Sequence, residues 1–170
     1  MDFGIELGQF SLSVFNYILM LSVITKNKRA YFDYEILEKY EAGLVLDGQE
    51  VKSIKTGHIS INGSFVTLKS SECWLIGATV PPYKMAGRLI GYEPGRSRKL
   101  LLHRREIDSL IGQTKQKGLT LVPLEVYTKG GKIKLKFGLA RGKKKYEKRE
   151  IIKKRETDKK IHEAMTMYKA

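Results

Sequence analysis

The chain has 170 residues, which suits one domain with an appendage and leaves no room for two full hydrophobic cores. Apolar residues make up 42% of it, and this excludes a wholly disordered chain. Lys and Arg number 32 against 18 Asp and Glu, and the net charge of +14 indicates a polyanionic partner, either a nucleic acid or an anionic membrane. The one cysteine, Cys73, excludes an internal disulfide and indicates a reducing, cytoplasmic compartment.

The positive charge is concentrated towards the end of the chain. Residues 1–25 contain two acidic residues and no basic ones, and residues 26–128 contain 16 basic and 11 acidic residues. Residues 129–170 contain 16 basic and only 5 acidic residues. The excess charge of the last quarter therefore sets it apart from the moderately basic part that precedes it.

Residues 10–25 form an apolar run that invites a signal-peptide or membrane-anchor interpretation. The residues before it are acidic, where a signal peptide needs positive charge, and the run is interrupted by polar side chains and too short to span a bilayer comfortably. We therefore expect no membrane contact. We interpret residues 1–25 as an extension and lead outside the folded domain, with 1–19 either disordered or upstream of the true start at Met20.

The first half of the chain predicts a long or kinked strand, a short helix and a hairpin. Residues 31–46 are rich in aromatic and aliphatic side chains, with Gly43 as a bulge. Asp47 and Glu50 have the spacing of a capping box and start a helix that ends at Gly57. Residues 64–69 and 73–79 predict two strands of a hairpin.

The second half predicts a basic loop, a helix and a second hairpin. Residues 84–99 combine glycines, a proline and five cations, which is typical of a mobile loop. An apolar pattern with helical period starts at Ile107 and ends before Gly118. Residues 119–128 and 133–139 flank the Gly130-Gly131 turn, and their alternation places Lys134 and Lys136 on the outer face. Hairpins interrupted by helices favour a mainly β fold, a small closed or half-closed barrel with two or three embedded helices.

Residues 143–170 form a basic tail with few large apolar side chains. Such a segment cannot bury a core of its own, so we expect it to be disordered when free. Oppositely charged pairs four residues apart would support a helix once the like charges are neutralised on binding, for example Glu150 with Lys154 and Glu156 with Lys160.

Several segments carry a specific resemblance to one family. They are Asn27-Lys-Arg-Ala30, Tyr40-Glu-Ala-Gly-Leu-Val-Leu46, Glu50-Val-Lys-Ser53, Arg98-Lys-Leu-Leu-Leu-His103, Gly118-Leu-Thr-Leu-Val-Pro123 and Ala140-Arg-Gly-Lys-Lys144. In unbroken order over about residues 26–155, they resemble small protein B, the SsrA-binding protein family of bacterial trans-translation. Residues 1–19 have no counterpart in the family pattern.

The resemblance implies a fold, a function and partners. It implies an oligonucleotide-binding (OB)-fold-like barrel over residues 26–142 that binds the tRNA-like domain of transfer-messenger RNA (SsrA RNA, tmRNA). With elongation factor Tu, such a monomeric factor delivers this RNA to stalled ribosomes for ribosome rescue and tagging of the nascent peptide. The resemblance implies no enzyme activity, no metal and no cofactor. In the tail, it implies contacts with 16S and 23S rRNA that sense an empty mRNA channel.

Individual site residues follow from the resemblance and from charge. The resemblance assigns RNA contacts to Asn27, Glu41 and Leu101, and ribosome contacts in the tail to Gly142, Lys143, Lys144 and Tyr146. Glu41 would accept hydrogen bonds from base amino groups or ribose hydroxyls, and Tyr146 would stack on an rRNA base. The remaining candidates are cations that would contact phosphates, namely Lys28, Arg29, Arg98, Lys99, Lys134 and Lys136 in the barrel and Lys148 and Arg149 in the tail.

Three questions stay open at this level. The sequence does not say which residue of the triplet Leu100–Leu102 faces outward. A nonspecific single-strand binder of the oligonucleotide-binding type is the alternative function. A small metal-dependent nuclease using Glu41 and Glu50 is a further hypothesis, although the histidines and Cys73 share no metal-ligand spacing.

Overall fold

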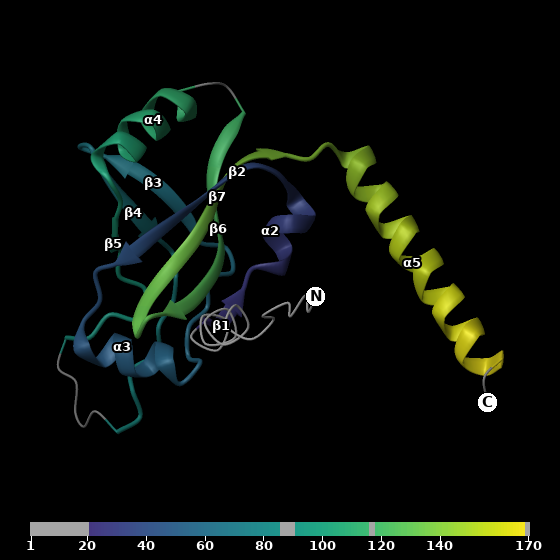
Figure 1. Cartoon of the computed structure of the whole chain (residues 1–170), viewed down its shortest axis with the longest axis horizontal. Coiled ribbons are helices and arrows are strands. Elements are labelled where there is room, and N and C mark those ends of the chain that lie inside the picture. The colour runs from purple at the N-terminus through teal and green to yellow at the C-terminus, as the bar shows by residue number, and fades with distance from the viewer. Residues whose placement is uncertain (1–20, 86–90, 116–117, 169–170) are drawn as a thin grey trace, which may run out of the picture.

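A computed structural model describes residues 21–85, 91–115 and 118–168 of the chain (Figure 1). The predicted extension over 1–19 and residues 86–90 of the predicted basic loop lie outside the described residues. In chain order, the elements are β1 (Leu21–Lys26), α2 (Lys28–Asp33), β2 (Tyr34–Leu44), α3 (Gly48–Lys55), β3 (Phe65–Lys69), β4 (Glu72–Ile76), β5 (Arg98–Leu101), α4 (Arg104–Thr114), β6 (Leu119–Lys129), β7 (Lys132–Gly142) and α5 (Lys145–Tyr168).

Six of the strands close into a barrel. Their order is β6-β3-β4-β5-β2-β7, and β7 returns to pair with β6, so the ring is complete. Every pairing is antiparallel, and β1 lies outside the ring as a further partner of β6. The structure thus confirms the predicted mainly β barrel with embedded helices.

Alternating residues of the strands fill the barrel. Leu75, Leu100 and Leu135 are all buried in one core cluster, while their neighbours along β4, β5 and β7 are at least partly exposed. On these strands the two-residue period therefore separates a core side from an outer side, where a ligand can reach side chains.

The predicted helices lie at opposite ends of the barrel in Figure 1. The capping interaction of α3 is present, because the carboxylate of Glu50 accepts a hydrogen bond from the backbone N–H of Asp47 at 2.9 Å. The apolar stripe of α4 packs inward, with Ile107 and Leu110 buried. Both helices therefore form where capping and periodicity predict them.

The start of the domain differs from the prediction in two ways. Residues 21–25 do not belong to a lead outside the fold, because β1 pairs with β6 from Leu21↔Lys129 to Lys26↔Glu125. The predicted strand over 31–46 begins only at Tyr34, since Lys28–Asp33 forms α2. Asn27 caps this helix, and its side-chain oxygen accepts a hydrogen bond from the N–H of Ala30 at 3.0 Å.

The basic tail forms one helix, α5, and Figure 1 shows it running away from the barrel. Its first turn is anchored on α2: the ammonium of Lys148 lies 2.7 Å from the carboxylate of Asp33. Further along, Lys159 and Glu163 form an ion pair at 3.6 Å, four residues apart. This pair has the four-residue spacing that the sequence analysis gives as support for a helix in the tail.

No helix among the described residues is long and apolar enough to cross a membrane.

Candidate RNA interface

Strand register brings three of the predicted RNA-binding residues together. On β2, Gly43 is paired with Leu101 of β5 on one side and with Lys134 of β7 on the other. Glu41 lies two residues before Gly43 and therefore on the same side of the sheet. Glu41, Leu101 and Lys134 line one open pocket of about 410 Å³, which also includes His103.

Leu101 is the member of the leucine triplet that faces outward. Its side chain is 55% exposed, whereas Leu100 is 2% exposed and packs in the core. Leu101 lies against Gly43: a Cβ atom on that glycine would be 3.4 Å from the Cβ of Leu101. The absence of a side chain at position 43 therefore lets the leucine lie across the neighbouring strand as an exposed apolar surface.

Glu41 is held by two strands of the barrel wall. Its carboxylate accepts hydrogen bonds from the ammonium of Lys134 and the hydroxyl of Tyr127, and the ammonium of Lys129 lies 3.8 Å away. The hydrogen bonds from Lys134 and Tyr127 hold the pKa of Glu41 below its ordinary value. Burial and the bond to Glu41 raise the pKa of Tyr127. Glu41 is therefore ionised and fixed in position, with acceptor capacity left over for a ligand.

A second carboxylate organises the neighbouring lysines of the outer wall. Glu125 on β6 lies 3.6 Å from the ammonium groups of both Lys26 and Lys136. Lys136 also lies 5.6 Å from the centre of the Tyr127 ring. We call the outward side chains of this wall the barrel face: Lys26, Glu41, Leu101, Glu125, Lys129, Lys134 and Lys136. It carries four lysines and two glutamates, so the barrel face is cationic but locally ordered by its acids.

This arrangement can recognise more than charge. The lysines supply phosphate contacts, the Glu41 carboxylate accepts hydrogen bonds from amino or hydroxyl groups, and Leu101 offers an apolar surface to an unstacked base or a sugar. A plain cationic surface would lack the last two properties. The barrel face therefore combines positioning contacts with groups that can discriminate between ligands.

Asn27 is corrected from a predicted RNA contact to a structural residue. It is 4% exposed. Its side-chain amide donates to the carbonyl of Pro123 at 3.1 Å and accepts from the N–H of Ala30. Each end of the amide therefore makes a bond that ties α2 to β6, and burial keeps the side chain away from a base edge.

Arg98 is likewise corrected, because it is fully buried rather than part of a mobile basic loop. Its guanidinium lies 2.8 Å from the carboxylate of Glu50, which is also fully buried, and Arg96 donates to the same carboxylate at 3.0 Å. Burial acts to raise the pKa of Glu50, but the two arginines and the Asp47 N–H outweigh it and lower the pKa. The pair fastens residues 96–98 to α3, and this also removes Glu50 from any shared site with Glu41.

The other predicted cations of the barrel stay at the surface. The side chain of Arg29 is 84% exposed and lies 3.2 Å from Asp33 on α2, where Lys28 is exposed as well. Lys99 is 39% exposed and pairs with Glu72 on the neighbouring strand. Lys28 and Arg29 lie on α2, outside the pocket that Leu101 and Glu41 line.

The tail residues divide into anchors and exposed groups. Lys143 is bound to α2, because its backbone N–H donates to the carbonyl of Asp33 and its ammonium donates to the carbonyl of Tyr31, both at 2.9 Å. The ion pair between Lys148 and Asp33 lowers the pKa of Asp33, chiefly through the hydrogen bond from the lysine. In contrast, the exposed members of the predicted tail motif are Gly142, Lys144, Tyr146 and Arg149.

Tyr127, which holds Glu41, and Lys129 of the barrel face are not among the residues that the sequence predicts for this site. The hairpin around Gly130-Gly131 contains the missing signal, because a two-residue turn sets Lys129 opposite Lys132 and Tyr127 opposite Lys134. Extending that register outwards would have placed Tyr127 beside the lysines. Its partner Glu41 lies 86 residues away in sequence, so that contact depends on the closure of the barrel.

Within the described residues, no group of three or more His, Cys, Asp or Glu side chains is arranged to hold a metal ion. Cys73 is fully buried, and burial raises the pKa of its thiol to about 12. The thiol is therefore a core group rather than a nucleophile or ligand.

The fold and this surface define a class of protein: a small antiparallel barrel with a cationic outer wall and a cationic terminal helix, built to bind a polyanion. The family model described as "SmpB protein" matches residues 24–167. The chain belongs to the SmpB family. This family consists of RNA-binding factors and not of enzymes, so the nuclease hypothesis is wrong.

Curated SsrA-binding proteins are similar in sequence to this chain over most of their length. The SsrA-binding protein of Gloeothece citriformis is 49% identical over 143 residues, which cover 84% of this chain and 92% of the relative. The SsrA-binding protein of Carboxydothermus hydrogenoformans is 49% identical over 146 residues, which cover 86% of this chain and 97% of the relative. A solved structure described as "tmRNA-SmpB: a journey to the center of the bacterial ribosome" is similar with a TM-score of 0.60 and 48% identity, covering 71% of this chain and 85% of that one.

Proposed function

We propose that this protein binds the tRNA-like domain of tmRNA through its barrel face and delivers that RNA, together with elongation factor Tu, to stalled ribosomes for trans-translation. Relatives at about half identity are named for binding SsrA RNA, and the similar solved structure is described by tmRNA and the bacterial ribosome. The observation that carries the proposal is the pocket of Glu41, Leu101 and Lys134, which joins an acceptor, an apolar surface and a cation.

The tail is the second part of the proposal. Lys144, just before α5, and Tyr146 and Arg149 in its first turns are exposed. Their chemistry suits phosphates and one stacked base of rRNA. An mRNA channel that holds no message would admit this helix, whereas an intact message would exclude it. The protein then acts as a monomer with one RNA on its barrel and another on its tail.

The first experiment measures affinity for an isolated tRNA-like domain of tmRNA at physiological salt. We expect Leu101→Ser to weaken binding about fivefold or more, because about half of a leucine side chain loses its contact with the RNA. The matched control is Leu37→Ser on β2, which is 42% exposed and lies outside the pocket. Equal affinity for the two variants would contradict the assigned interface.

The same assay tests the alternative of a nonspecific single-strand binder. An unstructured RNA of equal length serves as competitor, because phosphate contacts alone are largely lost at physiological salt. We expect the tRNA-like domain to be preferred by at least about tenfold. No preference would favour the nonspecific binder.

A further inference from the structure

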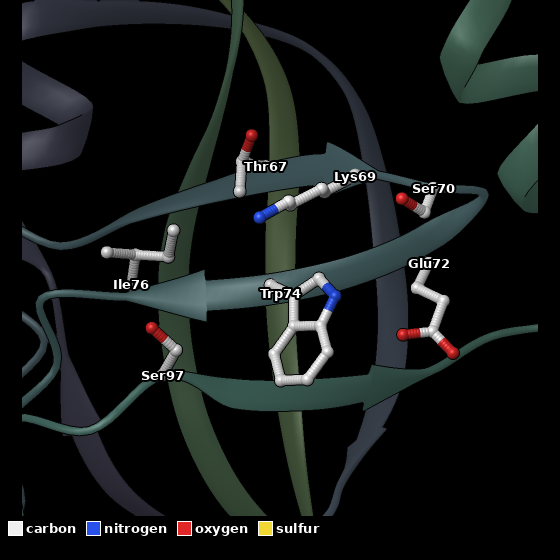
Figure 2. Close-up of a pocket in the computed structure, with 7 residues that line it drawn as sticks. All are labelled: Thr67, Lys69, Ser70, Glu72, Trp74, Ile76 and Ser97. Carbon is white, nitrogen blue, oxygen red and sulfur yellow. The ribbon is translucent and has the colours of Figure 1, made fainter.

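Outside the proposed interface, a hollow of about 410 Å³ lies on the outer side of β3, β4 and β5 (Figure 2). Its centre is Trp74 on β4. The neighbours of Trp74 along the strand, Cys73 and Leu75, are both fully buried, so the strand period directs the indole away from the core. Figure 2 shows the indole ring lying across β4 and β5 between Ser97 and Glu72.

Apart from Ile76 and Glu72, the side chains around the indole are cationic or hydroxyl-bearing. Thr67 and Lys99 are the direct cross-strand neighbours of Trp74, on β3 and β5 respectively. Figure 2 shows the Lys69 side chain extending back along β3 towards Thr67 and the indole, and Ser97 lies at the opposite edge of the hollow. These groups surround one large aromatic surface with phosphate-binding and hydrogen-bonding partners.

The acid in the hollow does not cancel this positive charge. Glu72 is already paired with Lys99, whose side chain is 39% exposed. Lys69 is exposed and adds one further positive charge beside the indole. The hollow therefore keeps a net positive charge, which suits a phosphate-bearing ligand.

The hollow is also continuous with the barrel face. Lys99 is opposite Trp74, and Leu101 follows two residues further along β5 on the same outer side, about 7 Å away along the strand. Leu101 in turn lies against Gly43, which is paired with Lys134. One strand therefore connects the indole to the proposed RNA site.

From these observations we infer that Trp74, with Lys69 and Lys99, is a second binding subsite that stacks an unpaired nucleobase of the RNA strand that the barrel face binds. An aromatic ring on a sheet suits any base, because every base has a flat π surface, and the flanking lysines contact the adjacent phosphates. A partner protein would need a larger apolar surface than one indole and Ile76 provide. This inference rests on the proposed function and adds a single-strand subsite to it.

Trp74 is the only tryptophan of the chain, so its fluorescence reports on this site alone. The test titrates the full-length protein with a short unstructured oligoadenylate under excitation that selects tryptophan over tyrosine. We expect saturable quenching of the Trp74 emission. Quenching should weaken in Lys69→Ala but not in Lys55→Ala, since Lys55 is an exposed lysine on α3 away from the hollow.

Two substitutions of the indole separate stacking from apolar contact. For binding of oligoadenylate measured with a labelled strand, Trp74→Phe should stay within about threefold of the wild type. Trp74→Leu, which keeps apolar bulk but no aromatic plane, should bind about tenfold more weakly. Thermal unfolding of both variants checks that the barrel is intact, and a variant that unfolds early is replaced by the Lys69→Ala comparison.

The outcomes separate this inference from the proposed function. Unchanged Trp74 emission, or equal binding by Trp74→Leu and wild type, overturns the stacking subsite while Leu101-dependent binding of the tRNA-like domain still supports the function. If Leu101→Ser leaves binding of the tRNA-like domain unchanged while oligoadenylate still quenches Trp74, the proposed interface fails and only a separate single-strand site is supported. Failure to bind either RNA overturns both.

Discussion

Replacing Arg98 by Met tests whether this predicted RNA contact is a structural residue. The substitution keeps the bulk of the side chain but removes its charge and donors. The buried carboxylate of Glu50 then keeps Arg96 but loses the 2.8 Å contact with Arg98, and the carbonyls of Ala78 and Pro94 lose donors at 2.7 and 2.9 Å. Removing one partner of a buried ion pair costs about 3–5 kcal/mol.

We expect Arg98→Met to lower the free energy of unfolding by about 3 kcal/mol, the lower end of that range. The loss is at the lower end because Arg96, whose side chain is 28% exposed to water, still pairs with Glu50. A domain of this size has about 5–15 kcal/mol of stability, so the variant should still fold. The assay is urea unfolding, with Lys99→Met as the control. The exposed pair of Lys99 with Glu72 is worth at most about 1 kcal/mol.

RNA affinity supplies the second readout for Arg98→Met. Because the guanidinium is fully buried, the folded variant should bind the tRNA-like domain within about threefold of the wild type. The structural role would be refuted if Arg98→Met lowered the free energy of unfolding by less than about 1 kcal/mol and weakened RNA binding by more than about tenfold. Arg98 would then be a phosphate contact.

Three further predictions concern the barrel wall and its core. Gly138→Ala should destabilise the protein by about 1–3 kcal/mol in urea unfolding, since the new Cβ would lie 2.8 Å from a side-chain atom of β2. As a control, Gly112→Ala in α4 meets nothing within 4 Å and should be neutral or stabilising. Equal effects of the two substitutions would contradict the packing around Gly138. Cys73 should react with a thiol reagent only at the rate of unfolding, because it is fully buried and its pKa is raised to about 12; fast labelling of the native protein would contradict this. Because the pKa of Glu41 is lowered in the folded protein, the stabilisation by its carboxylate is complete above the ordinary pKa of 4.5 and is lost as pH falls through the lowered pKa. The difference in unfolding free energy between wild type and Glu41→Gln should therefore shrink below about pH 4.5. A difference that grows on acidification would contradict this prediction.

The predicted elements that depend on local chemistry match the structure. The Gly130-Gly131 turn sets the register of its hairpin within a few residues, and the helical period of Ile107 and Leu110 defines the buried side of α4. Each of these signals is complete within one segment of the chain, so no distant contact is needed to interpret it.

What the sequence could not provide depends on distant pairings. Arg98 and Glu50 are 48 residues apart and Tyr127 and Glu41 are 86 apart, so only the closed barrel brings them together. A charge count treats a buried arginine and an exposed one alike, so charge alone predicts a phosphate contact for Arg98.

The sequence predicts neither the helix α2 nor the outward direction of Leu101, for two different reasons. The signal for α2 was present, since asparagine is a favoured N-cap, but the aromatic residues after Asn27 suggested a strand. The triplet Leu100–Leu102 contains no polar residue to reveal its outer side. Pairing with Gly43 determines that direction in the structure.

The central claim is that the barrel and the tail act on two different RNAs. The most direct measurement compares the full-length protein with a chain that ends after Gly142, in two assays: affinity for the tRNA-like domain and tagging of nascent chains on stalled ribosomes. The truncated chain would keep the complete β7 strand and the whole barrel face. We predict affinity within about tenfold of the full-length protein and no tagging. Loss of both activities to the same extent would contradict the claim that the barrel and the tail act on different RNAs.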